Sequence, residues 1–355
     1  MSIRCDFGFR ALRAWLLLPA ALGILSGAPA GADSAIPIGI IQYNAKNGNN
    51  GQGGWDPSGS LDIQMKMLVG KLKDPTNPAP VQFITLVQAP APLISHVLAS
   101  SQYNITDWQT IIGGCQGRDK KGNLYTEGVQ IAYFSKVWEL VPNMKQNPLA
   151  NTINSDHCFD SGRPYNLAYF QQKNATGFKV LFVLIHPPHC YDFYASGNPD
   201  DLRACIKTKG YLRKFGNFTS EVLAATGSSA ADLKNLNVVV VGDTNELGSR
   251  GLTPPGKSCP PYVGTPGGYE LVFPDFGPLK VSQIEGKTCS SANNETNGTC
   301  CSNNSHWQYF FDRIVVNHWV DDPVASIIDT NAYPLFNGSE EHKAIYGVVS
   351  FPAPK

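Results

Sequence analysis

The segment VVVVGDTN, residues 238–245, places four consecutive valines before a glycine, an aspartate, a threonine and an asparagine. A strand that is apolar at consecutive positions is covered on both faces, so it belongs inside a layered fold. Similar runs, rich in β-branched residues, predict further strands at residues 36–44, 81–88, 128–134, 165–171, 178–186, 311–317 and 344–351. The chain is therefore expected to fold around buried sheets.

Helical patterns lie between some of these strands, at residues 61–72 and at about 200–225. This alternation favours an α/β fold. No helix separates the runs at 165–171 and 178–186, and the run at 128–134 lies close before them. We interpret these three as antiparallel neighbours in a mixed sheet. No linker or repeat divides the chain, so residues 33–355 are predicted to form one large domain.

The amino terminus has the pattern of a secretory signal peptide, residues 1–32. Arginines at positions 4, 10 and 13 precede the apolar run WLLLPAALGIL, and small residues follow it up to Ala32. The run is too short to cross a bilayer of about 30 Å as a helix. A retained anchor is the alternative, but it would not need small residues at a cleavage position. The sequence predicts a secreted protein, extracellular or periplasmic, without a stable membrane anchor.

Composition restricts the partners of the exported chain. Removal of residues 1–32 takes three of the 28 Lys and Arg residues and one of the 28 Asp and Glu residues, which leaves a net charge of −2. The exported chain therefore has no overall positive charge that would attract a polyanion. Eight cysteines then remain and predict disulfides, although their pairing is not readable from the sequence. Seven sequons predict a glycoprotein if the source glycosylates: Asn104, Asn174, Asn217, Asn294, Asn297, Asn303 and Asn337.

Polar side chains able to handle a metal ion or a phosphate stand at the ends of several predicted strands. The run 36–44 ends on Asn44, the run 178–186 ends on His186, and the valine run ends on Asp243 with Asn245 two residues later. Such oxygen ligands suit Mg²⁺, an ionised aspartate can deprotonate water, and an imidazole can protonate a leaving oxygen. Each residue taken alone also has a structural explanation, such as a turn or a strand end.

The order of these motifs resembles the endonuclease/exonuclease/phosphatase superfamily, and in particular its deoxyribonuclease I-like branch. The resemblance rests on VVVVGDTNE, FDRIVV, VLIHPPH and SEEHKAIYGVV, and it spans residues 38–349. It implies a four-layer α/β sandwich, with two mixed β-sheets packed face to face and helices outside. It also implies hydrolysis of a phosphate ester with a divalent metal.

The resemblance assigns roles position by position. The positions implied for catalysis are His186, Asp243, Asn245 and His342. Those implied for Mg²⁺ or Mn²⁺ are Asn44, Gln88, Asp312 and Glu341. Arg163 and Asn245 are expected to contact phosphate oxygens. Arg118 and His189 are weaker candidates near the same site.

This chain departs from the family pattern at two carboxylates. The strand expected to end in Leu-Gln-Glu reads FITLVQAP, so the family's Glu is replaced by Ala89 or, with a shift of one residue, by Gln88. The family's Asp before its catalytic His is Glu341 here, with Glu340 as an alternative. A lost carboxylate should weaken Mg²⁺ binding. Glu127, beside the start of the predicted strand at 128–134, is a candidate replacement for the lost charge, but we expect it to be an exposed loop residue.

Three functions follow from this pattern. The first is an exported, metal-dependent phosphodiesterase that acts as a monomer on nucleic acid or another phosphodiester, with weakly bound Mg²⁺ or Mn²⁺. The second is a binding protein that kept the fold after losing its metal carboxylate. The third is a phosphoesterase for a lipid head group or a small phosphate ester. The branch-like motifs favour the first.

Overall fold

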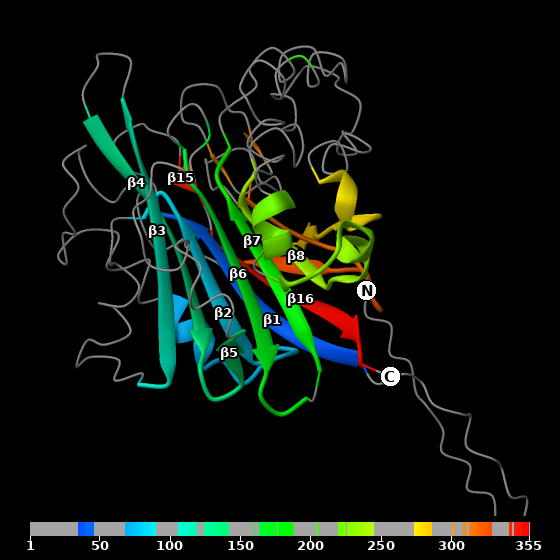
Figure 1. The fold of residues 1–355 in the computed structure, drawn as a ribbon. Coiled ribbons are helices and arrows are strands. Elements are labelled where there is room, and N and C mark those ends of the chain that lie inside the picture. The colour runs from blue at the N-terminus through cyan, green and yellow to red at the C-terminus, as the bar shows by residue number, and fades with distance from the viewer. Residues whose placement is uncertain are drawn as a thin grey trace, which may run out of the picture. The chain divides into compact units, whose positions relative to one another are not determined.

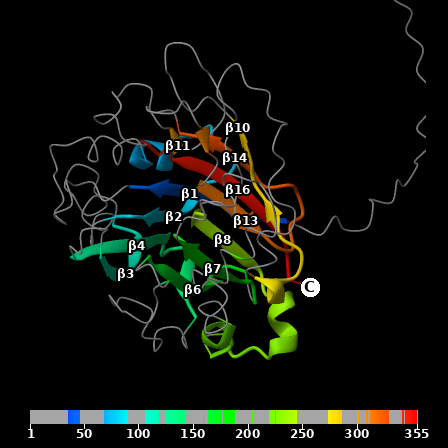
Figure 2. The same ribbon diagram turned by 90° about the horizontal axis from the view of Figure 1, so that it is seen from above.

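Two mixed β-sheets face each other across a shared apolar layer in this computed structural model (Figures 1 and 2). The first sheet has the order β10-β14-β16-β1-β2-β4-β3, and the second has the order β5-β6-β7-β8-β13-β9. In the first sheet, β1 pairs parallel with β2 and antiparallel with β16. In the second sheet, β7 pairs parallel with β8 and antiparallel with β6. The predicted pair of mixed sheets packed face to face is confirmed.

The structure describes residues 35–45, 68–89, 106–118, 124–141, 159, 163–175, 177–187, 204, 219–224, 226–244, 273–285, 300–301, 308–309, 312–328, 341–342 and 344–354. Ala35–Lys355 form one compact unit. None of the described helices is long and apolar enough to cross a membrane. Parts of both expected helical regions are described and are helical, at residues 68–72 and 219–224.

The strands of the first sheet are β1 (Ala35–Asn44), β2 (Val81–Val87), β3 (Trp108–Arg118), β4 (Leu124–Phe134), β10 (Gln283–Glu285), β14 (Val324–Ile327) and β16 (Ile345–Pro352). Those of the second are β5 (Trp138–Leu140), β6 (Tyr165–Gln172), β7 (Lys179–Ile185), β8 (Val238–Asp243), β9 (Lys280–Val281) and β13 (Asp312–Val316). A small third sheet has the order β12-β11-β15, from β11 (Cys300–Cys301), β12 (Gln308–Tyr309) and β15 (Glu341–His342).

One expected pairing is wrong. Residues 128–134, within β4, lie in the first sheet between β2 and β3, whereas β6 and β7 pair antiparallel in the second sheet. A short turn after Phe134, closed by the Val137 N–H on the Phe134 carbonyl at 3.0 Å, lets the chain pass from β4 to β5. Closeness in sequence therefore did not place β4 and β6 in one sheet.

The valine strand is buried on both faces, as its sequence predicts. Val239 and Val241 belong to the inter-sheet layer, which we define as the buried apolar side chains that the two sheets direct toward each other. Val238 and Val240 lie on the opposite face. They are covered by residues that include Val222, Leu233, Phe273 and Phe276, the last three on or beside the 3-10 helices η3 (Ala230–Asn235) and η5 (Pro274–Phe276).

The inter-sheet layer changes from apolar to polar at one end, and this change positions the site. Side chains alternate between the two faces of a strand, so Ile38, Ile40, Gln42 and Asn44 of β1 share a face. The first two lie in the apolar layer, and the two amides follow it. By the same alternation, Asp243 shares a face of β8 with Val241, and Asp312 shares a face of β13 with Ile314.

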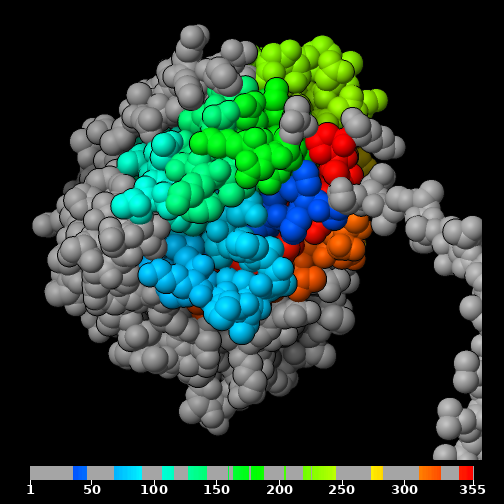
Figure 3. Space-filling view, turned by 90° about the horizontal axis from the view of Figure 1, so that it is seen from below, coloured from blue at the N-terminus to red at the C-terminus, as the bar shows by residue number. Residues whose placement is uncertain are grey.

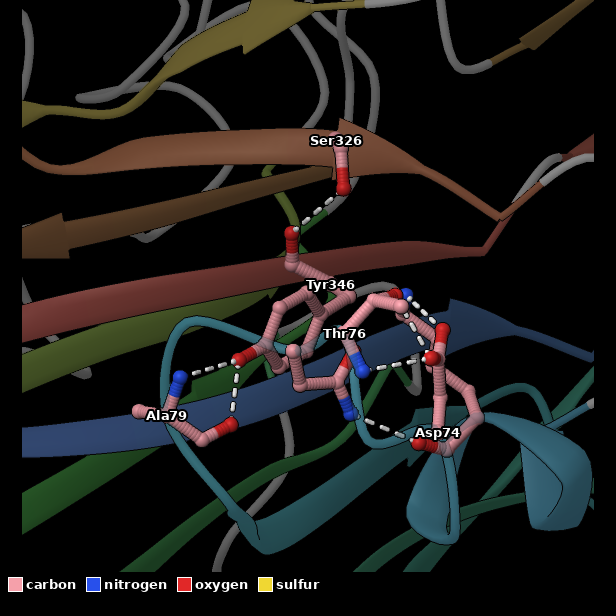
Figure 4. A network of polar contacts seen from close by, with 7 residues as sticks. Asp74, Thr76, Ala79, Ser326 and Tyr346 are labelled. Atoms are coloured by element: carbon pink, nitrogen blue, oxygen red, sulfur yellow. Dashed lines mark hydrogen bonds and ion pairs between the residues drawn. The ribbon is translucent and has the colours of Figure 1, made fainter.

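The outer face of the first sheet, opposite the inter-sheet layer, is covered in part by the segment that leads into β2. Figure 3 shows β1 (blue) between the green strands and the cyan segment that leads into β2. That segment is fastened to β16: the Tyr346 hydroxyl accepts from the Ala79 N–H at 3.2 Å and donates to the Ala79 carbonyl at 2.5 Å (Figure 4). Burial raises the pKa of Tyr346, so the hydroxyl keeps the proton that it donates. Lys71 lies over the same ring and pairs with Asp74.

Asn317 links the strands that carry the two buried aspartates. Its Oδ1 accepts from the Val238 N–H at 2.7 Å, and its Nδ2 donates to the carbonyls of Leu236 at 2.7 Å and Phe276 at 3.0 Å. The side chain is fully buried. It therefore ties the end of β13 to the start of β8 and to η5.

Replacement of Asn317 by alanine should lower the free energy of unfolding by about 3 kcal/mol, because it strands one buried N–H and two buried carbonyls. Urea denaturation measures this loss. Asn235→Ala, at an exposed position of η3, is the matched control and should change stability by less than about 0.5 kcal/mol. A loss at Asn317 no larger than that of the control would contradict the linking role.

Candidate active site

Two buried aspartates lie side by side at the polar end of the second sheet. Asp243, the last residue of β8, pairs directly with Asp312, the first residue of β13. Like charges at directly opposed positions repel each other, so these carboxylates need donors or cations nearby. The first sheet supplies donors: Asn44 Nδ2 donates to Asp243 Oδ2 at 2.7 Å, and Gln42 Nε2 donates to Asp312 Oδ1 at 3.4 Å.

Gly242 allows β8 to deliver Asp243 to this place. Its φ of 137° is one that L side chains rarely adopt, and an added Cβ would lie 2.0 Å from the Ile185 carbonyl oxygen. Glycine is therefore required where β8 passes close to β7. The close approach places Asp243 beside His186, which directly follows β7.

His186 lies between two carboxylates and is only 1% exposed. Its Nδ1 contacts Glu127 Oε1, and its Nε2 is 3.5 Å from Asp243 Oδ2. Arg163 Nη1 contacts the same ring and lies 3.1 Å from Nδ1. An arginine is always a donor. The cluster therefore combines a fixed positive charge, an imidazole and two carboxylates.

Glu127 holds a proton within this cluster. Burial raises its pKa to about 8; the positive charge of Arg163 opposes the rise and the negative charge of Asp243 adds to it. Glu127 and His186 are in direct contact, so a proton lies between the two side chains near neutral pH. This pair is equipped to give or accept a proton.

The expectation that Glu127 is an exposed loop residue is wrong, because it is only 2% exposed and belongs to β4. Alternation along β4 could have revealed this. Val129, Ile131 and Tyr133 all face the inter-sheet layer, and Glu127 is the next position on that face. The sequence did not identify its partner, because His186 comes from the other sheet.

The end of β2 contains no carboxylate at either position where the family pattern places one. Ala89 is fully buried in an apolar cluster with Tyr43 and Ala45, and its N–H donates to the Gly128 carbonyl at 3.1 Å. Gln88, a predicted metal ligand, is partly buried and has a φ of 50°. Within the described part of the chain, no group of three His, Cys, Asp or Glu residues is placed to hold a metal ion.

Several predicted site residues cannot be placed by their side chains. Asn245 and His189 lie outside the described residues, and so do the side chains of Arg118, Glu341 and His342. The backbone of β15 pairs with β11, so that His342 is opposite Cys300 and Glu341 is opposite Cys301. Among the predicted residues, the structure brings together Asn44, Arg163, His186, Asp243 and Asp312.

The chemistry of the donor set fits a weakly held Mg²⁺. This ion prefers oxygen ligands, keeps several waters, and commonly binds through one or two carboxylates together with substrate phosphates. Asp243, Asp312 and the amide oxygen of Asn44 are donors of that kind. Glu127 is engaged with His186 and is not counted among them.

Comparisons with known proteins give structural likeness without sequence matches. No protein-family model and no curated protein match the chain. Among solved structures, an endonuclease/exonuclease/phosphatase from Bacteroides vulgatus has a TM-score of 0.47 at 13% identity, covering 88% of this chain and 98% of that one. The mannosyl-6-phosphatase of Bacteroides thetaiotaomicron has a TM-score of 0.47 at 17% identity, covering 88% and 100%.

A third similar structure is ANGEL2, described as a 2',3'-cyclic phosphatase, with a TM-score of 0.44 at 9% identity and coverage of 90% and 96%. Similarity at this level does not transfer an activity from one protein to another. The chemistry of this chain must therefore come from its own side chains.

Replacement of Glu127 by glutamine should flatten the pH dependence of stability between about pH 4.5 and pH 8. The raised pKa means that the folded protein binds this proton more tightly than the unfolded chain does. The contribution is fully present below the unfolded value and is lost as the pH rises through about 8. Urea denaturation across this range measures it. Glu139→Gln, at a partly buried position on β5, should keep the native profile.

Proposed function

We propose that this protein is a phosphoester hydrolase of the endonuclease/exonuclease/phosphatase type, and most simply an exported phosphodiesterase that cleaves nucleic acid. The observation that carries the proposal is the convergence of Glu127, His186, Arg163 and Asp243 at one end of the sandwich. It joins a proton-holding pair, a carboxylate and a guanidinium, which can transfer protons and stabilise negative charge during phosphoester hydrolysis.

The geometry suggests a role for each group. Asp243 accepts a proton from the attacking water, since the hydrogen bond from Asn44 orients its carboxylate. Arg163 balances negative charge on the phosphate, for which a planar guanidinium is well suited. The Glu127–His186 pair supplies a proton to the leaving oxygen, because burial keeps that proton bound near neutral pH. Asn245 and His342 are expected to contribute a phosphate contact and a second imidazole.

Mg²⁺ or Mn²⁺ would be held by Asp312 and Asn44, with Asp243 nearby and Glu341 and Gln88 as further candidates. When bound, such an ion would neutralise charge that develops on the phosphate. The absence of a carboxylate at positions 88 and 89 favours weak binding. The same absence supports the second candidate function, a binding protein that retains the fold.

Export is part of the proposal. It rests on the signal pattern of residues 1–32 and on the disulfide-bonded state of Cys115, a fully buried residue on β3. Disulfides persist in oxidising compartments. A monomer without a membrane anchor is the simplest form of such a protein. A phosphoesterase for lipid head groups or small esters remains the third candidate.

Hydrolysis of plasmid DNA and of bis(p-nitrophenyl) phosphate, with Mg²⁺ or Mn²⁺ present, tests the proposal. Asp243→Asn should lower the rate at least about 100-fold, because the amide cannot accept the proton. Asp322→Asn, at an exposed position, should leave the rate unchanged. Hydrolysis that survives Asp243→Asn would reject the mechanism.

The same assay separates the candidate functions. Cleavage of a phosphomonoester or a lipid phosphodiester, with DNA and RNA untouched, would favour the third candidate. No hydrolysis by the native chain, together with activity in Ala89→Glu or Gln88→Glu, would identify a degenerate site and favour the binding protein.

A further inference from the structure

Two amide side chains of strand β1 lie beside the two buried carboxylates of the second sheet. Gln42 and Asn44 are 0% and 1% exposed, and they stand on the same face of β1. Each donates to a different aspartate: Gln42 to Asp312 at 3.4 Å, and Asn44 to Asp243 at 2.7 Å. The first sheet thus meets the aspartate pair with one amide per carboxylate.

The amide of Gln42 is held in the donating orientation. Thr85, on the neighbouring strand β2, places its Oγ1 2.6 Å from Gln42 Oε1, and its hydroxyl can donate to that oxygen. A second acceptor, the Ile41 carbonyl, lies 3.1 Å from the same hydroxyl. Because Thr85 engages the oxygen of the amide, the NH₂ group is turned toward Asp312. Three residues therefore form a chain that ends on a carboxylate.

We propose that Gln42 and Asn44 are counter-donors, meaning that their N–H groups compensate Asp312 and Asp243 in the free protein in place of a divalent cation. The cation then binds weakly to the free protein and more tightly together with a phosphate. The phosphate part of this inference rests on the proposed function. Gln42 is accordingly a positioning residue, which acts through Asp312.

The physical reason is competition for the same oxygens. Two buried carboxylates at opposed positions must be compensated, and charged groups that accept hydrogen bonds are stabilised by them. A cation that binds these oxygens must displace or turn the amide hydrogens, which lowers its net affinity. A phosphate contributes further oxygen ligands and negative charge, and so it shifts the balance toward the cation.

Thermal unfolding with and without Mg²⁺ tests the proposal in two variants of Gln42, at about 5 mM, which exceeds the roughly 0.1–1 mM dissociation constants of weak Ca²⁺ sites. Gln42→Glu adds a carboxylate and should raise the Mg²⁺ affinity roughly tenfold, since affinity follows the number of charged ligands. Gln42→Met removes the donor. It should lower the melting temperature in metal-free buffer, and Mg²⁺ should recover part of that loss.

Gln82 provides matched controls, because it lies on β2 three residues before Thr85 and contacts Trp138 and Pro37 instead of an aspartate. Gln82→Glu and Gln82→Met should show the Mg²⁺-dependent shift of the native protein. Equal shifts in the native protein and in both Gln42 variants would overturn the proposal. A merely structural role for Gln42 would lower stability without making it depend on Mg²⁺.

Calorimetric titration of the native protein gives a test that needs no variant. Mg²⁺ alone should bind weakly, and its affinity should rise when inorganic phosphate is present. Tight binding of Mg²⁺ by the native protein without phosphate would overturn the counter-donor proposal, even if the protein hydrolyses DNA. If this affinity pattern holds and no phosphoester is cleaved, the proposed function alone fails.

Discussion

The directly opposed pair of Asp243 and Asp312 is the constraint that the rest of the site must satisfy. Two carboxylates excluded from water repel each other, and neither is stable without donors or positive charge nearby. On the second sheet, His186 lies beside Asp243, with its Nε2 3.5 Å from Asp243 Oδ2. The facing sheet adds donors from β1, through Asn44 and Gln42. The site is therefore a product of the sandwich and exists only when both sheets are packed.

The same dependence explains the Glu127–His186 pair. Glu127 is supplied by the first sheet and His186 by the second, and burial of both makes proton sharing favourable. Asn317 and Gly242 support this arrangement, Asn317 by tying β13 to β8 and Gly242 by allowing β8 to approach β7. Packing of the apolar side chains between the two sheets thus holds the charged and polar groups of the site in fixed positions.

Much of the fold could be predicted because its signals are local. Consecutive β-branched residues identified the valine strand as buried on both faces, and each predicted strand is present among the described residues. The position of β4 could not be predicted, because a short turn passes the chain from one sheet to the other. The same limit applies to Glu127. Its burial follows from alternation along β4, but its partner comes from a strand that is distant in sequence.

Asn166 shows that the polar region extends deeper than the reacting groups. It is 1% exposed on β6, and neither polar atom of its side chain has a hydrogen-bond partner among the described residues. Its Nδ2 would lie 3.1 Å from a Cβ added to Gly113. Gly113 pairs with Val129, which is two residues from Glu127 on the same face of β4. A buried amide without hydrogen-bond partners lowers the free energy of unfolding by about 1–3 kcal/mol. Violations of this kind are expected at functional sites, and Asn166 pairs with Leu184, two residues before His186.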